Sequence, residues 1–269
     1  MSTHPDTPRL WLWEGRPPAS SPADDFRPWL ELYLLPGETT RGAVLVCPGG
    51  GYVDRAPHEA APIAEVFNAA GMHAFVLQYR VAPHRHPAPL LDASRAMRIV
   101  RANAEDWHVD PSRIAVCGFS AGGHLTASLG VHFDLPDLEI GDALDGVSCR
   151  PDALVLAYPV ISSASHVHRG SFENLLGPAP GPDLLSLMSL ELQVSDETPP
   201  AFLWHTAEDT AVPVENSLRF AEALHAHGVP FELHVYPKGE HGLGLAEGDP
   251  HVASWYELCV EWLQGMGWS

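Results

Sequence analysis

Residues 113–123 read RIAVCGFSAGG, an apolar run followed by the pattern G-x-S-x-G. The run from Arg113 to Cys117 has the length and composition of a buried strand, and the stretch that follows the pattern has the composition of a helix. The glycines of the pattern, Gly118 and Gly122 on either side of Ser120, allow a tight strand-to-helix turn that lifts the serine hydroxyl out of the sheet. This context makes Ser120 a candidate nucleophile. The alternative is an ordinary glycine-rich turn in which Ser120 caps the helix.

A serine hydroxyl is a weak nucleophile, so the pattern predicts a histidine base and an orienting carboxylate later in the chain. His241 lies in a glycine-flanked loop just after the predicted strand 231–236. Asp209 lies just past the predicted strand 200–205, with Glu208 beside it as a rival. Taken singly, His241 could be a surface-loop histidine and Asp209 a carboxylate at a helix start. Three suitable residue types after three separate strands, in the order serine, acid, histidine, favour a catalytic triad.

The segment 47–52, Cys-Pro-Gly-Gly-Gly-Tyr, directly follows another short apolar run. Its glycines leave backbone amides uncovered, and preorganised amides stabilise the oxyanion of acyl transfer. The amides of Gly50 and Gly51, together with that of Ala121, are therefore the predicted oxyanion hole. A phosphate-binding loop is disfavoured because no Gly-Lys-Ser/Thr follows and the G-x-G-x-x-G spacing is missing. Tyr52, next to these glycines, is a candidate for stacking on a substrate ring or for simple packing.

The rest of the chain alternates strand-like and helix-like segments. The expected strands are 29–35, 43–47, 73–79, 113–117, 153–158, 200–205 and 231–236, and the expected helices are 59–70, 89–103, 121–133, 214–227 and 251–266. Strands separated by crossover helices predict an α/β fold with a mainly parallel central sheet and helices on both faces.

The domain organisation expected from this alternation is a single α/β domain over residues 29–269. Residues 1–28 are rich in Pro, Ser and Asp and are interpreted as a loosely attached lead-in, whose apolar segment 10–13 is still able to dock. Segments 134–151 and 162–199 fit the alternation poorly. They are expected to be inserts near strand ends that shape the pocket.

The composition of the chain disfavours several classes of partner and binding site. The 269 residues carry 15 Lys plus Arg against 34 Asp plus Glu, a net charge of −19, which disfavours nucleic acid and anionic membranes as partners. No secretion signal and no apolar run long enough to cross a bilayer are recognisable, so a cytoplasmic protein is expected by default. The four cysteines are far apart and form no CxxC pair, which disfavours zinc and disulfides.

Several other polar residues are expected to have structural roles and not catalytic ones. Glu59 either anchors the glycine-rich segment 47–52, called the glycine loop below, or solvates a helix start, and the second interpretation is favoured. His124 is expected to be structural, because one helical turn carries it away from Ser120. Six further histidines are paired along the sequence without a carboxylate at ligand-like spacing, so no metal is expected. They are His84, His86, His166, His168, His225 and His227.

Together these motifs resemble the α/β-hydrolase superfamily, and within it the esterase/lipase group that contains acetyl xylan esterases and bacterial feruloyl/acetyl esterases. The resemblance covers roughly residues 30–268. It rests on Pro48-Gly49-Gly50-Gly51-Tyr52, Gln78-Tyr79-Arg80, Gly118-Phe119-Ser120-Ala121-Gly122-Gly123-His124, Pro199-Pro200-Ala201-Phe202-Leu203-Trp204-His205 with Glu208-Asp209, and Gly239-Glu240-His241-Gly242. Pro48 stands where the lipase relatives have the histidine of HGGG, a departure that the sugar-esterase branch shares.

The resemblance implies hydrolysis of short acyl esters, often acetyl groups on xylose units, without a metal or organic cofactor. The expected partner is thus a small acyl ester, an acetylated sugar first of all. An arylformamidase or small peptidase of the same superfamily is the alternative among enzymes, which turnover of formyl-kynurenine would distinguish. A non-catalytic binding relative is the second alternative, but it would not need Ser120, Asp209 and His241 together.

Overall fold

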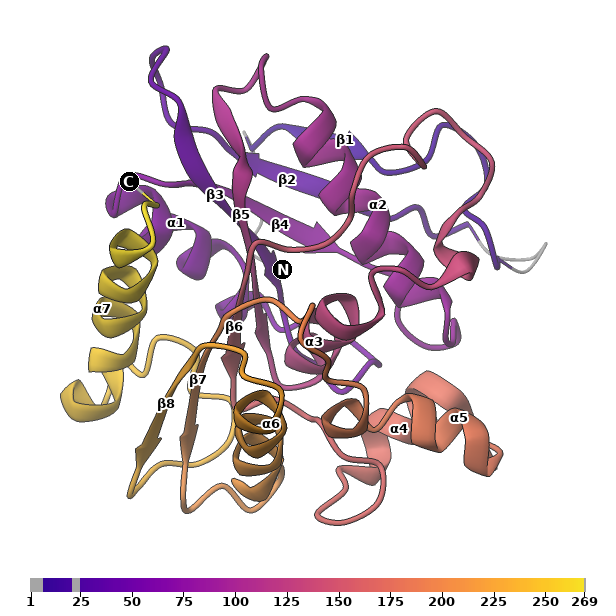
Figure 1. The fold of residues 1–269 in the computed structure, drawn as a ribbon, viewed down its shortest axis with the longest axis vertical. Coiled ribbons are helices and arrows are strands. Elements are labelled where there is room, and N and C mark those ends of the chain that lie inside the picture. Colours follow the sequence, from indigo (N-terminus) through magenta and orange to yellow (C-terminus); the bar gives the residue numbers. More distant parts are fainter. Residues whose placement is uncertain (1–6, 21–24, 269) are drawn as a thin grey trace.

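The computed structural model describes residues 7–20 and 25–268, which form one eight-stranded sheet with helices on both faces (Figure 1). The strands are β1 (Arg9–Trp11), β2 (Trp29–Tyr33), β3 (Arg41–Cys47), β4 (His73–Gln78), β5 (Val109–Phe119), β6 (Ala153–Ala157), β7 (Ala201–Thr206) and β8 (Phe231–Tyr236). The helices are α1 (Ala61–Ala69), α2 (Ala88–Ala102), α3 (Ala121–His132), α4 (Arg169–Leu176), α5 (Pro182–Leu187), α6 (Glu215–Ala226) and α7 (Pro250–Gly265). Three short 3₁₀ turns are η1 (Pro57–Glu59), η2 (Pro136–Leu138) and η3 (Leu190–Leu192).

The sheet is mainly parallel. The strand order is β1-β2-β4-β3-β5-β6-β7-β8, and only the pairs β1–β2 and β2–β4 are antiparallel. The predicted fold class is therefore confirmed. The predicted boundaries differ by a few residues, most at β5, which begins at Val109 because that residue pairs with Arg41 of β3.

Apolar side chains on the two faces of the sheet pack against different helices. Along β3, Val44 and Val46 join the cluster that α1 and α7 cover, whereas Leu45 and Cys47 join the cluster that α2 and α3 cover. Helix α6 closes the second face over β6 and β7, and Figure 1 shows α1 and α7 on the side opposite α2, α3 and α6. A sheet buried on both faces explains why β3, β5 and β6 are continuous apolar runs.

The parallel arrangement brings distant loops to one edge of the sheet. Because β3, β5, β7 and β8 run in the same direction, the loops after their carboxyl ends open at that edge. These loops carry the glycine segment, Ser120, Asp209 and His241. The insert after β6, residues 162–199, adds α4 and α5, two short helices that the sequence did not predict.

The apolar segment 10–13 of the lead-in docks on the sheet, although the composition around it favours loose attachment. β1 pairs antiparallel with β2, and Leu12 and Trp13 are buried in the core. The indole of Trp13 donates to the buried carboxylate of Asp92 at 3.0 Å. Burial of large apolar side chains, at about 1.5–3 kcal/mol each, outweighs the turn-forming composition around them. Residues 1–6 and 21–24 of the lead-in lie outside the described residues.

Within residues 7–20 and 25–268, no helix has both the length and the apolar character required to span a bilayer.

Candidate active site

Ser120 lies on a strained turn between β5 and α3. Its backbone has φ 52° and ψ −117°, which is unusual for a residue with a side chain and typical of strain at functional sites. The turn requires close packing: a Cβ on Gly122 would lie 2.1 Å from the carbonyl oxygen of Cys47. Glycine at position 122 thus lets the start of α3 approach the end of β3.

The structure brings together the three residues that the sequence analysis predicted as a triad. The Ser120 hydroxyl Oγ lies 2.8 Å from Nε2 of His241. Nδ1 of the same ring lies 2.6 Å from Oδ2 of Asp209. With the carboxylate ionised, Nδ1 carries the proton and Nε2 accepts the hydrogen bond from the serine. This is the tautomer that a general base needs.

The carboxylate of Asp209 is held from several sides. Its Oδ1 accepts the backbone amides of Ala211 at 3.0 Å and Val212 at 2.9 Å. Its Oδ2 also lies 3.3 Å from Nε2 of His205, a buried histidine at the end of β7. Burial raises the pKa of Asp209, but the hydrogen bonds from His205 and His241 and the amide of Val212 outweigh it, so the net pKa is well below the ordinary value. Asp209 is therefore ionised wherever His241 acts as a base.

The glycine loop packs directly against the serine. A Cβ on Gly49 would lie 3.0 Å from Cβ of Ser120. Gly50 has φ 124°, and a side chain there would collide with the carbonyl of Asp54 at 2.3 Å. Among the described residues, none accepts a hydrogen bond from the amides of Gly50, Gly51 or Ala121. These three amides are thus free to bind an oxyanion, and their assignment as the oxyanion hole stays a prediction.

A buried carboxylate connects the glycine loop to the loop after β8 that carries His241. Glu59 is 2% exposed; its Oε2 accepts the amide of Gly49 at 2.8 Å, and its Oε1 accepts the hydroxyl of Tyr158 at 2.6 Å. The Tyr158 oxygen in turn accepts the amide of Gly244 at 2.9 Å, and the phenol ring meets the ring of His241 edge-on. The favoured interpretation of Glu59 as a solvated helix start is wrong. Glu59 instead anchors the glycine loop, because the turn η1 directs its carboxylate inward.

Replacing Glu59 with glutamine should lower kcat by about tenfold, because one of its two acceptor oxygens becomes an amide donor that faces another donor. Glu59→Ala should also lower the free energy of unfolding by about 3 kcal/mol, since it leaves the Gly49 amide and the Tyr158 hydroxyl without an acceptor. Steady-state kinetics beside urea denaturation check both expectations, with the exposed Glu222→Gln as control. A natural kcat in Glu59→Gln would contradict the positioning role.

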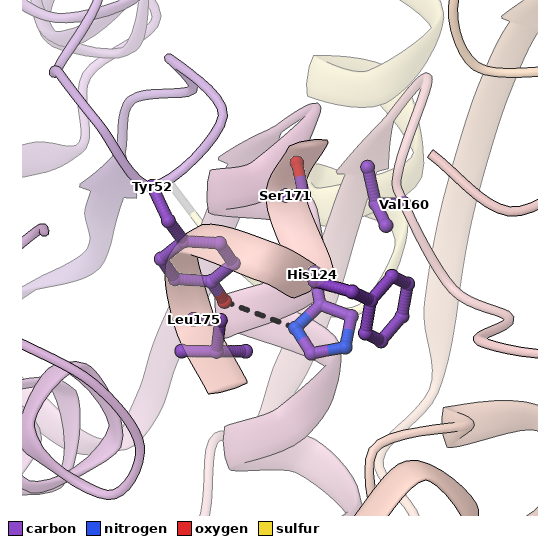
Figure 2. Close-up of a pocket in the computed structure, with 6 residues that line it drawn as sticks. Tyr52, His124, Val160, Ser171 and Leu175 are labelled. Atoms are coloured by element: carbon purple, nitrogen blue, oxygen red, sulfur yellow. Dashed lines mark hydrogen bonds between the residues drawn. The ribbon is translucent and has the colours of Figure 1, made fainter. Parts of the chain in front are cut away.

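Tyr52 does not lie where a substrate ring could stack, which corrects its assignment as a substrate-binding residue. Its side chain is 2% exposed, and its hydroxyl lies 2.9 Å from Nδ1 of His124 (Figure 2). Both rings pack beneath α4 against Val160, Ser171, Phe172 and Leu175, with no room between them for a water molecule. The physical reason is that α4, absent from the sequence prediction, covers the ring. His124 donates its Nε2–H to the carbonyl of Met188 at 3.0 Å and is structural, as predicted.

Acid should destabilise the protein through His124. Burial lowers the pKa of this residue from 6.5 to about 4, so between these values the unfolded chain binds a proton that the folded protein does not. The free energy of unfolding therefore falls as the pH drops from 6.5 toward 4, by roughly 3 kcal/mol from this residue alone. Urea denaturation at several pH values checks this. The loss should shrink in His124→Gln and persist in the exposed control His225→Asn. An equal loss in His124→Gln would contradict it.

Two of the histidines that are paired along the sequence, His166 and His168, lie in different surroundings. Nε2 of His166 lies 3.6 Å from Glu215 on an exposed surface. His168 is half-buried, and burial lowers its pKa, with a smaller lowering by His241 and an opposing effect of Asp209. In the part of the chain that the structure describes, no three His, Cys, Asp or Glu side chains are grouped as metal ligands. The sequence analysis missed His205 as a support of the triad, although it lies only four residues before Asp209, because a histidine within a predicted strand gave no signal of that role.

A family model and several solved structures are similar to this chain. The BD-FAE family matches residues 30–224. A solved structure of an acetyl ester-xyloside bifunctional hydrolase from Caldicellulosiruptor lactoaceticus superposes with a TM-score of 0.94 at 50% identity, covering 97% of both chains. The carboxylesterase Cest-2923 from Lactobacillus plantarum WCFS1 superposes with a TM-score of 0.80 at 28% identity, covering 97% of this chain and 98% of that one.

Curated relatives include longer proteins. Endo-1,4-beta-xylanase B of Butyrivibrio fibrisolvens is 43% identical over 234 residues, which are 86% of this chain and 36% of the relative. The acetylxylan esterase of Xylanibacter ruminicola is 31% identical over 240 residues, which are 87% of this chain and 46% of the relative. The chain thus spans between about a third and a half of the length of these two proteins.

Proposed function

Because the chain belongs to the BD-FAE family of α/β-hydrolases, we propose that it is a serine esterase that removes short acyl groups, acetyl first of all, from sugar esters such as those of xylo-oligosaccharides. The observation that carries the proposal is the continuous hydrogen-bond chain from Ser120 Oγ through His241 to Asp209, at 2.8 and 2.6 Å. The names of an acetyl ester-xyloside hydrolase and an acetylxylan esterase among its relatives support the substrate class.

The acylation step assigns one role to each member of the triad. Ser120 Oγ attacks the ester carbonyl carbon while Nε2 of His241 takes the hydroxyl proton. The ionised Asp209 holds the ring in the required tautomer and stabilises the imidazolium that forms. The tetrahedral intermediate then collapses, the carbon–oxygen bond to the alcohol breaks, and His241 gives its proton to the departing sugar oxygen.

Deacylation repeats the chemistry with water. His241 takes a proton from the water as its oxygen attacks the acyl carbon, and the intermediate collapses to release acetate and return the proton to Ser120 Oγ. In both steps negative charge develops on the former carbonyl oxygen. The amides of Gly50, Gly51 and Ala121 are the donors proposed for it, each worth about 3–4 kcal/mol in the transition state.

The first experiment measures acetate release by the natural protein from acetylated xylo-oligosaccharides and from p-nitrophenyl acetate. The expected result is turnover of both, with a higher kcat/KM for the sugar ester. Hydrolysis of the aryl ester alone would leave the esterase assignment standing and remove the sugar substrate class. A series of p-nitrophenyl esters from acetate to octanoate measures the acyl preference: kcat/KM should decline as the acyl chain becomes longer.

Cytoplasmic localisation stays a prediction, and fractionation of the source cells would test it.

A further inference from the structure

A second histidine contacts the carboxylate of the triad acid. His205 is fully buried near the carboxyl end of β7, and its Nε2 lies 3.3 Å from Oδ2 of Asp209. Nδ1 of His241 lies 2.6 Å from the same oxygen. The other oxygen, Oδ1, accepts the amides of Ala211 and Val212. Oδ2 is therefore shared between two imidazole rings, and the acylation and deacylation steps use only one of them.

The hydrogen bonds of His205 determine which of its nitrogens carries the proton. Nε2 lies 2.8 Å from the carbonyl oxygen of Val212, an atom that can only accept. In the neutral ring Nε2 is therefore the protonated nitrogen, and its N–H is within reach of both the Val212 carbonyl and the Asp209 carboxylate. Nδ1 lies 2.8 Å from the hydroxyl of Ser217, on α6. With the proton on Nε2, that hydroxyl donates to Nδ1.

These contacts fix the direction of the Asp209 carboxylate. Val212 donates its amide to Oδ1 and accepts the Nε2–H of His205 on its carbonyl, so the ring fastens the short loop after β7 to the strand itself. Ser217 holds the ring from α6. A carboxylate with donors on both oxygens has little freedom to rotate, and a side chain held in this way keeps its reactive geometry. Oδ2 thus stays directed at His241.

We propose that His205 is a positioning residue that directs Oδ2 of Asp209 at His241 and, as a second donor on that oxygen, extends the activity of the esterase to lower pH. This inference rests on the proposed function and deepens it, because it names a residue that acts on the base through the acid.

The effect on pH follows from the charge on Oδ2. A donor on an ionised carboxylate stabilises its negative charge and leaves less of that charge to stabilise a neighbouring imidazolium. In the free enzyme the imidazolium is the inactive form, because Nε2 of His241 then has no lone pair for the proton of Ser120. Loss of the His205 donor favours this inactive form, so activity should disappear at a higher pH.

Other titratable groups also face Asp209 and His241, and none of them differs between variants at position 205. They are His168 before α4, Tyr158 after β6, and His58 and Glu59 on η1, while Glu208 and Glu240 are the exposed chain neighbours of the pair. A difference between two variants at position 205 therefore reports on the contacts of that side chain.

Two amide variants separate the two nitrogens of the ring. In His205→Gln the side-chain NH₂ takes the place of Nε2 and donates to Asp209, whereas the acceptor for Ser217 is lost. In His205→Asn the side-chain oxygen takes the place of Nδ1 and accepts from Ser217, whereas the donor on Asp209 is lost. A role in folding alone would lower the stability of both variants and leave the pH profile in place. His225→Asn, exposed on α6, is the control.

The measurement is kcat and kcat/KM for p-nitrophenyl acetate from about pH 5 to about pH 9, where the acid side of kcat/KM reports protonation of the free base. In His205→Asn the acid midpoint of kcat/KM should rise by about 0.5 pH unit, and kcat at the optimum should fall about tenfold with little change in KM. In His205→Gln the midpoint should stay within about 0.2 pH unit and kcat within about threefold of the natural values. His225→Asn should match the natural protein in both.

Neutron diffraction from crystals of the natural protein tests the same inference without a substitution, and it decides the matter if the variants do not fold. The expected result is a deuteron on Nε2 of His205, shared between the Asp209 carboxylate and the Val212 carbonyl. A deuteron on Nδ1 alone, a deuteron directed only at Val212, or an Nε2–Oδ2 distance above about 3.5 Å would overturn the inference.

The kinetic outcomes distinguish this inference from the proposed function. An unchanged acid midpoint or an unchanged kcat in His205→Asn overturns the inference alone, and so does an equal effect of the two amide variants. The natural protein is the reference for the proposed function. If it releases acetate from neither p-nitrophenyl acetate nor acetylated xylo-oligosaccharides, the proposed function is overturned, and this inference with it.

Discussion

Ser120→Ala should lower kcat for acetate release by about 10⁴-fold or more while the protein stays folded. The expected loss is this large because the serine supplies the atom that bonds to the acyl carbon, and no other hydroxyl is shown within hydrogen-bond reach of His241 Nε2 among the described residues. Alanine also removes an atom from a strained turn without filling new space. The free energy of unfolding should therefore change by less than about 1 kcal/mol.

The matched control for this result is Ser94→Ala. Ser94 is buried in α2, and its hydroxyl has no hydrogen-bond partner among the described residues. Its removal should leave kcat unchanged. A serine-directed phosphonate should also label the natural protein once per chain and fail to label Ser120→Ala, as seen by intact mass. Full activity in Ser120→Ala would overturn the mechanism as a whole.

The strand-to-helix turn at Ser120 explains why so much of the fold was predictable. The predicted central strands, such as β3, β5 and β6, are short apolar runs with a turn signal at their ends. Glycine is required at position 122 because a Cβ there would lie 2.1 Å from the carbonyl oxygen of Cys47. The local composition of these segments therefore predicts where the backbone forms a strand or a tight turn. The position of Asp209 and His241 follows from the same logic, because parallel strands place the ends of β7 and β8 at the edge where β5 ends.

Most of the contacts that sequence could not predict join distant parts of the chain. Glu59 meets Tyr158 across 99 positions, and Asn174 reaches Gly51 across 123. The side chain of Tyr52 is buried because α4 packs over it, although the hydrophobic periodicity of residues 162–199 is too weak to predict that helix. Irregular inserts lack the repeating pattern on which prediction depends. The insert docks through a few buried apolar side chains, such as Phe172 and Leu175, and through individual hydrogen bonds.

Hydrogen bonds hold the glycine loop from two sides. Glu59 fixes the glycine loop from within, through the amide of Gly49. Asn174 fixes the same loop from the insert, through the carbonyl of Gly51. The insert 162–199 is thus attached to the loop whose amides are proposed to bind the oxyanion. Changes in residues 162–199 are therefore expected to alter kcat as well as substrate preference.

Asp209→Asn should lower kcat by about 10⁴-fold with little change in KM, and the hydrogen bonds at this side chain give the reason. Oδ1 accepts two backbone amides, from Ala211 and Val212, so an asparagine would place its carbonyl oxygen there. Its NH₂ group would then face Nδ1 of His241 in place of Oδ2. A donor at that position makes Nδ1 an acceptor and moves the ring proton to Nε2. The base is then blocked in the tautomer that cannot take a proton from Ser120.

Glu208→Gln is the control that decides between the two neighbouring acids. Glu208 is exposed, and Asp209 is the one that lies 2.6 Å from His241. The glutamine variant should therefore keep kcat within about twofold of the natural value, as is usual for surface substitutions. Denaturation curves of both variants check that each is folded at the assay pH. If Glu208→Gln abolished activity and Asp209→Asn retained it, Glu208 would be the orienting acid. The short contact at Asp209 would then have no part in the base's action, because only the acid that holds Nδ1–H keeps Nε2 free to accept.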